Sequence, residues 1–363
     1  MTDSAVVGRI LREYHLTGVE PSGVRWLAGS VRGDRVTYHL GSRGGPGLVV
    51  RAFRTDVPLD TQFRAGGTVT VTDWLCGRAA VLAWLEDQAY PAPRAIRTHS
   101  GDPVGLAGVW ATLATSYVAG TPLRPGTGAM RLLGEALGRL HALDSGTFTG
   151  ALAGGAGAGG GGAVGVAARR AAWHPETAVP AALGRLEAVR SLIPADQLVL
   201  LEQFQAVLLA LQQRAELLPA AVVHGDPWPG NAIQTAPDQV TLIDWENAGL
   251  GMPLLDLGYC LLECHLDAGL PAGQPAARHI EPDEDRIAAL AAGYSRWRRL
   301  EPAERDMLLE GIRFAAAYVG AIHLEQAFVG GVRGRPMDVR LERLRNRLAV
   351  SEAVAGLARR HFS

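Results

Sequence analysis

The feature that most constrains this chain is the stretch AVVHGDPWPGNAIQTAPDQVTLIDWENAG at residues 221–249. Its central side chains are costly to bury and pack poorly, yet they lie between two apolar runs that are typical of protein cores. The two prolines of PWPG remove backbone donors, so this part cannot be helical. We therefore predict two short strands that bring Asp226, Asn231 and Asp244 close together.

The residue types in this loop indicate a chemistry. Asparagine and aspartate supply oxygen ligands of the kind that Mg²⁺ prefers. A further carboxylate beside them can orient a hydroxyl group and accept its proton. Aspartates in short turns often only cap the loop, but three polar residues with these roles in this order favour a functional site.

Composition limits the class of protein. A chain of 363 residues is too long for one small core, so two or more lobes are expected. Apolar residues make up 48% and charged residues 20%, which is typical of a globular protein. The net charge of -1 gives no overall field that would attract nucleic acid or an anionic membrane, so we expect neither as a partner.

All 35 basic residues are arginines, which excludes any lysine-dependent mechanism, including that of a P-loop. The three cysteines (Cys76, Cys260 and Cys264) give no disulfide framework, and Cys260 and Cys264 are expected to act as small buried hydrophobic residues. The N-terminus lacks the apolar core of a signal peptide, and residues 151–168 are too rich in Gly and Ala to insert into a membrane. These features favour a soluble cytoplasmic protein.

Periodicity divides the chain into two parts. VRWLAGS, RVTYHLG and LVVRAFR predict a three-stranded antiparallel meander, and GRAAVLAWLEDQ predicts a helix after it. Beyond residue 120 the pattern is helical, apart from a Gly/Ala insert at 150–166 that we expect to be flexible. We therefore predict a small N-terminal lobe at 1–118 and a mainly helical lobe at 119–363.

The motifs HGDPWPGN and IDWE, in this order, resemble the catalytic and metal-binding loops of the aminoglycoside phosphotransferase and choline kinase-like superfamily of small-molecule kinases. The segments SYVAGTPL and LGRLHALD extend the resemblance over most of the chain. The resemblance implies an α+β, bilobal protein-kinase-like fold with a small antiparallel-sheet N-lobe and a larger, mainly helical C-lobe.

The resemblance also implies roles for individual residues. Asp226 corresponds to the catalytic base, and His224 shapes the catalytic loop. Asn231 and Asp244 correspond to the Mg²⁺ ligands. Asp256, in MPLLDLG, resembles the acid that ties this region down from a following helix.

The N-lobe is expected to bind the nucleotide, ATP or GTP. The turn GSVRGD could be a simple hairpin, but its place before two strands favours it as the candidate phosphate cover. TSYVAG is the candidate hinge that faces the base. The residues expected in these two segments are Gly29, Ser30, Gly33, Ser116, Tyr117 and Val118.

The N-lobe departs from the family pattern at one charged pair. The family has a lysine on the third strand that holds the phosphates and pairs with a glutamate on the next helix. Here Arg51 takes the place of the lysine and could bind phosphate as a two-pronged fork, whereas Arg54 is expected to face solvent. Ala79 stands where the acid is expected, and Asp73 or Glu86 could substitute for it.

Residues for the acceptor are less clearly marked. Glu263 and Asp267 follow the metal loop, which is the predicted metal-binding loop at IDWE. They lie on a segment that lines the acceptor cleft in the family. Tyr294 and Trp297 could wall a ring or a quaternary ammonium, although their spacing favours a packing role in the core or at the surface for both.

These features predict a phosphotransferase that moves the γ-phosphate of ATP or GTP to a hydroxyl of a small molecule. An antibiotic or another secondary metabolite is the first choice of acceptor. The alternatives are a metabolic kinase for choline, homoserine or a sugar, and a kinase-like binding module without activity. A Mg²⁺-dependent phosphatase fits the two-lobe pattern poorly.

Overall fold

The computed structural model describes residues 4–14, 24–29, 34–42, 45–57, 69–148, 170–195, 198–264, 281–329 and 337–362. Three of the predicted site residues (Ser30, Gly33 and Asp267) and the Gly/Ala insert at 150–166 lie outside these ranges.

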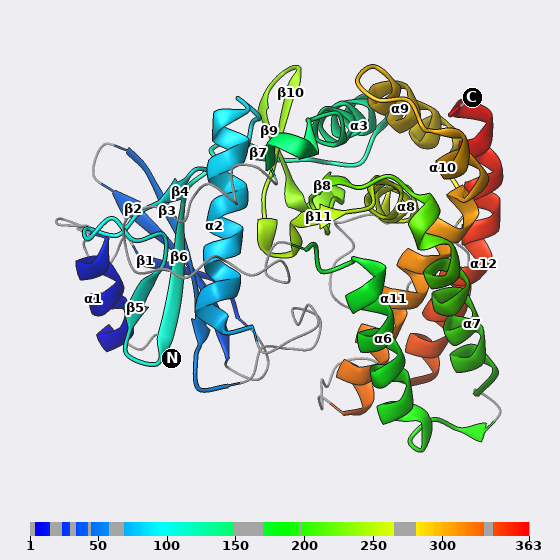
Figure 1. Ribbon diagram of the computed structural model, residues 1–363, viewed down its shortest axis with the longest axis horizontal. Coiled ribbons are helices and arrows are strands. Elements are labelled where there is room, and N and C mark those ends of the chain that lie inside the picture. Colours follow the sequence, from blue (N-terminus) through cyan, green and yellow to red (C-terminus); the bar gives the residue numbers. More distant parts are fainter. Residues whose placement is uncertain are drawn as a thin grey trace.

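The chain alternates strands and helices in its first third and is mainly helical afterwards (Figure 1). The α-helices are α1 (Ser4–Glu13), α2 (Val71–Asp87), α3 (Thr127–His141), α6 (Pro175–Arg190), α7 (Leu198–Arg214), α8 (Pro253–Glu263), α9 (Glu284–Ser295), α10 (Pro302–Asp306), α11 (Leu308–Phe328) and α12 (Met337–His361). The strands are β1 (Val24–Gly29), β2 (Arg35–Ser42), β3 (Gly45–Arg54), β4 (Ala95–Ile96), β5 (Gly105–Ala107), β6 (Trp110–Ser116), β7 (Thr121–Pro122), β8 (Ala221–Val223), β9 (Ala232–Ala236), β10 (Gln239–Leu242) and β11 (Gly249–Gly251).

The N-lobe is built on a six-stranded antiparallel sheet in the order β1-β2-β3-β6-β4, with β5 on β6. The predicted meander is therefore present as β1–β3. Successive side chains of a strand point to opposite faces. On β3, Val50 and Ala52 accordingly pack with α1 in one apolar cluster, while Phe53 packs with α2 in another. Arg51 shares the face of Phe53, which is the face covered by α2.

The C-lobe holds the larger core, in which helices α3, α6, α7, α8, α9, α11 and α12 pack together. Figure 1 shows these helices on the right and the N-lobe sheet on the left, with α2 between the sheet and the short strands β7–β11. Two small sheets, β10-β9-β7 and β11-β8, carry the loops of the site. Among the described residues, no helix is both long enough and apolar enough to cross a membrane.

Candidate functional site

The backbone of Ile243 joins the two loops of the 221–249 segment. Its N–H donates to the carbonyl of Asn231 at 2.9 Å, and its carbonyl lies 2.9 Å from Nε2 of His224. Nδ1 of His224 accepts the N–H of Asp226 at 3.2 Å, so the proton of this imidazole belongs on Nε2 and is donated to Ile243. Burial lowers the pKa of His224, which favours this neutral form.

The turn at Gly225 is held from below by Asp256 on α8. The two carboxylate oxygens accept the N–H groups of His224 at 2.6 Å and Gly225 at 2.8 Å, which is the contact expected for this acid. Gly225 has a φ of 79°, and a Cβ there would collide with the carbonyl oxygen of Asn247. Only glycine meets both demands, which explains why it precedes Asp226.

The Asp226 carboxylate is held by neighbouring donors. Nδ2 of Asn231 donates to its Oδ2 at 2.8 Å and to its backbone carbonyl at 3.0 Å, and the hydroxyl of Tyr259 also bonds to the carboxylate. Burial raises the pKa of Asp226 well above its usual value, and the nearby Asp244 raises it further. The result is a fixed carboxylate with increased affinity for a proton.

Asp244 lies near the Asp226 carboxylate and carries a buried oxygen. Its backbone is left-handed, with a φ of 68°, a conformation that only a few non-glycine residues adopt and that aspartate tolerates better than most. Its Oδ1 is buried and accepts no hydrogen bond from the described residues, although Nη2 of Arg51 lies 3.1 Å away. A buried carboxylate oxygen that meets only the charge of Arg51 among the described residues is of the type that can bind a metal ion.

The residues present fit a magnesium ion. The amide nitrogen of Asn231 is committed to Asp226, which leaves its oxygen as the atom that can face a cation. No group of three or more His, Cys, Asp or Glu side chains in the described ranges could hold a metal alone. Mg²⁺ commonly takes one or two protein oxygens and completes its shell with water and substrate phosphate, so two ligands are enough.

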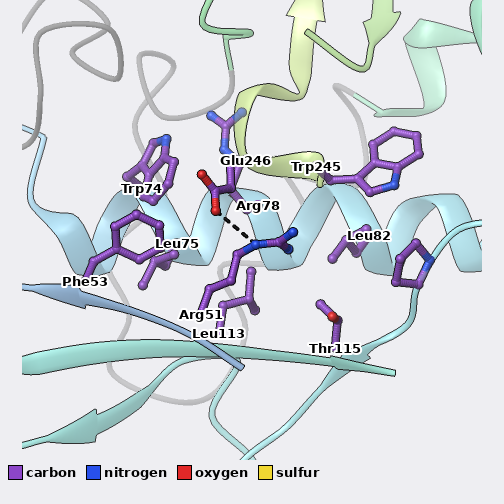
Figure 2. Close-up of a pocket in the computed structure, with 11 residues that line it drawn as sticks. Arg51, Phe53, Trp74, Leu75, Arg78, Leu82, Leu113, Thr115, Trp245 and Glu246 are labelled. Carbon is purple, nitrogen blue, oxygen red and sulfur yellow. Dashed lines mark ion pairs between the residues drawn. The ribbon is translucent and has the colours of Figure 1, made fainter. Parts of the chain in front are cut away.

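Arg51 reaches across the lobes to the metal loop. Its Nη2 lies 3.1 Å from Oδ1 of Asp244, and its Nε lies 2.9 Å from Oε1 of Glu246, which follows Asp244 in the short 3₁₀ helix η6 (Trp245–Asn247). Figure 2 shows Arg51 and Glu246 pointing toward one another in a pocket that α2 also lines. Burial acts to lower the pKa of Arg51, but the two acids more than offset it and the pKa is raised.

The expected helix acids do not pair with Arg51, so that prediction was wrong. Asp73 accepts the hydroxyl of Thr70 at the exposed start of α2, and Glu86 lies 3.1 Å from Arg94. Ala79 is buried in the apolar cluster under the sheet. Our sequence interpretation missed Glu246, although its place two residues after Asp244 in IDWE was a visible signal.

Arg54 faces solvent as predicted. It pairs with Asp56 at 2.5 Å, and both side chains are more than a third exposed (39% and 44%). Arg51, at 15%, is far more buried. Between the two arginines of β3, only Arg51 therefore lies at the site.

Two backbone N–H groups of the hinge segment are already hydrogen-bonded within the protein. The N–H of Ser116 donates to Arg94, and that of Tyr117 donates to Gly47, so neither is open to a ligand. No described residue accepts a hydrogen bond from the N–H of Val118. Gly29 ends β1 opposite Val36 and begins the candidate phosphate cover.

The expected acceptor residues are placed differently from one another. Glu263 is 5% exposed and pairs with Arg347 of α12 at 2.6 Å, so its charge is already balanced. Trp297 is exposed and lies against Arg139. Tyr294 is fully buried, and its hydroxyl bonds to His141 and Arg298 at 3.0 Å. A side chain without exposed surface cannot wall an acceptor, so Tyr294 has the packing role.

A buried polar chain supports the catalytic loop from behind. Nε2 of His141 lies 3.3 Å from the Asp256 carboxylate, and its Nδ1 lies 3.0 Å from the Tyr294 hydroxyl. Arg298 joins the same hydroxyl to Glu304, which is fully buried. This chain connects α9 and α10 to the turn at Gly225 and is a support that the sequence motifs did not reveal.

Comparison with known proteins places this geometry in context. The model of the phosphotransferase enzyme family matches residues 34–303, which include both loops and Arg51. A comparison with curated protein sequences gave no significant match.

Several solved structures share the fold. The amicoumacin kinase hAmiN, in complex with AMP-PNP and Ca²⁺, has a TM-score of 0.67 at 16% identity, and the alignment covers 97% of this chain and 94% of that one. A choline/ethanolamine kinase family protein from Mesorhizobium loti has a TM-score of 0.58 at 20% identity, with 100% and 99% covered. A microcompartment-associated aminopropanol kinase has a TM-score of 0.60 at 17% identity, with 98% and 99% covered. These similarities confirm the predicted bilobal α+β fold.

Proposed function

Since the chain belongs to the phosphotransferase enzyme family and is a small-molecule kinase, we propose that it transfers the γ-phosphate of ATP or GTP to a hydroxyl of an antibiotic or another secondary metabolite. The observation that carries this proposal is the arrangement of Asp226, Asn231 and Asp244 around one backbone residue, with Arg51 reaching them from the other lobe. Such a set contains what phosphoryl transfer requires, which is alignment and charge neutralisation. A nucleotide substrate also favours a cytoplasmic enzyme.

Asp226 is proposed as the base. Its carboxylate would accept a hydrogen bond from the acceptor hydroxyl and take the proton as the oxygen attacks phosphorus. Asn231 and Tyr259 hold the carboxylate in one orientation, and burial raises its pKa toward the range in which a base is effective. His224 contributes indirectly, because it shapes the loop through Ile243.

Asn231 and Asp244 are proposed as the residues that hold Mg²⁺. Bound there, the ion would neutralise charge on the nucleotide phosphates. Arg51 would supply a second, permanent positive charge to these phosphates through its remaining N–H groups. Gly29, Ser30 and Gly33 are proposed to cover the phosphates, and Val118 to meet the base.

Two observations bear on the acceptor class. The charge of Glu263 is balanced by Arg347, so we do not expect Glu263 to select an acceptor with an amine by charge alone. Structural neighbours include an amicoumacin kinase and a spectinomycin phosphotransferase as well as an aminopropanol kinase. We therefore keep the antibiotic or secondary metabolite as the first candidate and a small metabolic alcohol as the second, with Trp297 and Asp267 as further candidate contacts.

A screen of hydroxyl acceptors with γ-labelled ATP and GTP tests the proposal. Its panel should contain aminoglycosides, macrolides, peptide antibiotics, choline, ethanolamine, homoserine and sugars. Mg²⁺-dependent transfer of label to an antibiotic supports the first candidate, and transfer only to small alcohols supports the second. Absence of transfer to every acceptor, by enzyme that binds Mg-nucleotide, would contradict both.

A further inference from the structure

Arg51 carries a mostly buried guanidinium, 15% exposed, which requires a fixed anion if it is to hold one position. The helix α2, which covers its face of the sheet, offers Ala79 and the buried Arg78 at this level and no acid. The first-turn acid Asp73 and the last-turn acid Glu86 bind other partners. The anion that contacts Arg51 outside the metal ligand Asp244 is Glu246, as Figure 2 shows.

Glu246 is held on both of its oxygens. Oε1 lies 2.9 Å from Nε of Arg51, and Oε2 lies 2.9 Å from Nη1 of Arg35 on the neighbouring strand β2. Arg35 is paired in register with Phe53, and Arg51 with Thr37, so the two arginines are diagonal neighbours on the same face of the sheet. The carboxylate, 11% exposed, therefore bridges two adjacent strands of the N-lobe from a loop of the C-lobe.

This contact determines how Arg51 faces the metal loop. The guanidinium is planar and rigid, so fixing Nε against Glu246 fixes the direction of the other two nitrogens. One of them, Nη2, then lies 3.1 Å from Asp244, and Nη1 is left for a further anion. A lysine ammonium is a point charge and could not divide its contacts in this planar way.

We propose that Glu246 is the positioning residue for Arg51 and replaces, from the metal loop, the acid that the family places on the helix, with Arg35 as the clamp that holds Glu246. The inference rests on the proposed role of Arg51 toward nucleotide phosphate. It means that the cation of the N-lobe is aligned by the C-lobe rather than by α2. Exposed ion pairs contribute little, but the Arg51–Glu246 pair is mostly removed from water, so its loss should be measurable.

The test measures Mg-AMP-PNP affinity by calorimetry, which does not depend on the acceptor. Glu246→Gln should weaken binding by roughly 10-fold or more, the scale for a lost charge-assisted contact. Arg35→Gln should weaken it less, because Arg51 keeps its partner. Two matched controls at the end of β3 and just beyond it, Arg54→Gln and Asp56→Asn, remove an exposed pair of the same charges and should leave affinity unchanged.

The double variant Arg51→Gln with Glu246→Gln identifies how Glu246 acts. If Glu246 acts through Arg51, the double variant binds no more weakly than Arg51→Gln alone. In a steady-state assay, Glu246→Gln should then raise the nucleotide KM and lower kcat while the acceptor KM stays unchanged.

Additive losses, together with a higher Mg²⁺ concentration for half-maximal binding in Glu246→Gln, would show Glu246 to be a metal ligand and overturn the inference. Unchanged affinity in both Glu246→Gln and Arg35→Gln would also overturn it. If Glu246→Gln does not fold, the Arg35→Gln result decides alone. Wild-type enzyme that binds no Mg-nucleotide would instead contradict the proposed function, so the two failures are distinguishable.

Discussion

Asp226 combines a partly buried position with a second carboxylate nearby, which is unfavourable for the folded state when both are ionised. Burial and Asp244 raise its pKa well above the usual value. When the pKa of an acid is higher in the folded protein than in the unfolded chain, the free energy of unfolding decreases as the pH rises toward and through the folded-state pKa. The site is therefore expected to be strained until a cation binds between the acids.

The first prediction follows from this decrease in stability with rising pH. Asp226→Asn keeps an oxygen to accept from Asn231 but removes the charge, so it should unfold at a higher temperature than wild type at pH 8. The difference should shrink as the pH falls below the raised pKa and vanish toward the ordinary pKa of aspartate, where the carboxyl is protonated in the unfolded chain as well. Melting curves from pH 4 to pH 8 measure it.

The exposed Asp56 provides the control for this experiment. Its hydrogen bond with Arg54 lowers its pKa, so Asp56→Asn should give no stabilisation at any of these pH values. An Asp226→Asn protein that is no more stable at pH 8, or whose gain does not vary with pH, would contradict the account of the buried carboxyl.

The second prediction concerns the metal. Asp244→Ala should abolish the Mg²⁺-dependent part of nucleotide binding in calorimetry, because the variant lacks the carboxylate oxygens proposed to hold the ion. The exposed Asp238→Ala, in the turn between β9 and β10, serves as control. Unchanged Mg-nucleotide affinity in Asp244→Ala would show that another residue holds the ion.

The individual site residues show what a sequence can and cannot predict. Asp226, Asn231 and Asp244 stand in short motifs, so their proximity followed from local chain geometry. The contact of Arg51 with Glu246 joins residues from different lobes, and no local pattern encodes it. The same reason explains the missed Arg347, which reaches Glu263 from the last helix.

At the level of elements, helices α3 and α9 pack closely against each other where both carry glycines, a contact that we call the glycine seam. A Cβ on Gly134 would collide with the carbonyl of Leu290, and one on Gly293 with the carbonyl of Arg131. Backbones that lie this close leave no space for a methyl group. The seam places Tyr294 against His141, so it connects helix packing to the support of the catalytic loop.

The third prediction tests the seam. Gly293→Ala should lower the melting temperature by several degrees, because overpacking costs about 1–3 kcal/mol and the colliding atoms are backbone. Gly128→Ala, in the first turn of α3 with no heavy atom within 4 Å, should leave it unchanged or raise it slightly. Equal melting temperatures for the two variants would contradict the close packing.

Strand pairing was harder to predict than strand location. The apolar runs at β8 and β10 were predicted, but each pairs with a strand that the sequence did not indicate, β11 and β9 respectively. Both missed strands are three to five residues long and contain glycine or polar residues, so periodicity gives little signal. The loops still converge, because Asn231 and His224 both bond to Ile243.

At the level of the whole molecule, the site is completed only when both lobes contribute. The C-lobe supplies Asp226, Asn231 and Asp244, and the N-lobe supplies Arg51, with Glu246 as the contact between them. The two-lobe division followed from periodicity, whereas the ion pairs across it required the structure. The central claim is that this assembly transfers phosphate with Asp226 as the base.

The most direct test is the turnover of Asp226→Asn with the acceptor that the screen identifies. Phosphoryl transfer should fall by roughly 100-fold or more, the scale of losing a positioned base, while calorimetry shows wild-type affinity for Mg-nucleotide. Near-normal turnover in the folded, nucleotide-binding variant would remove Asp226 from the mechanism and contradict the account.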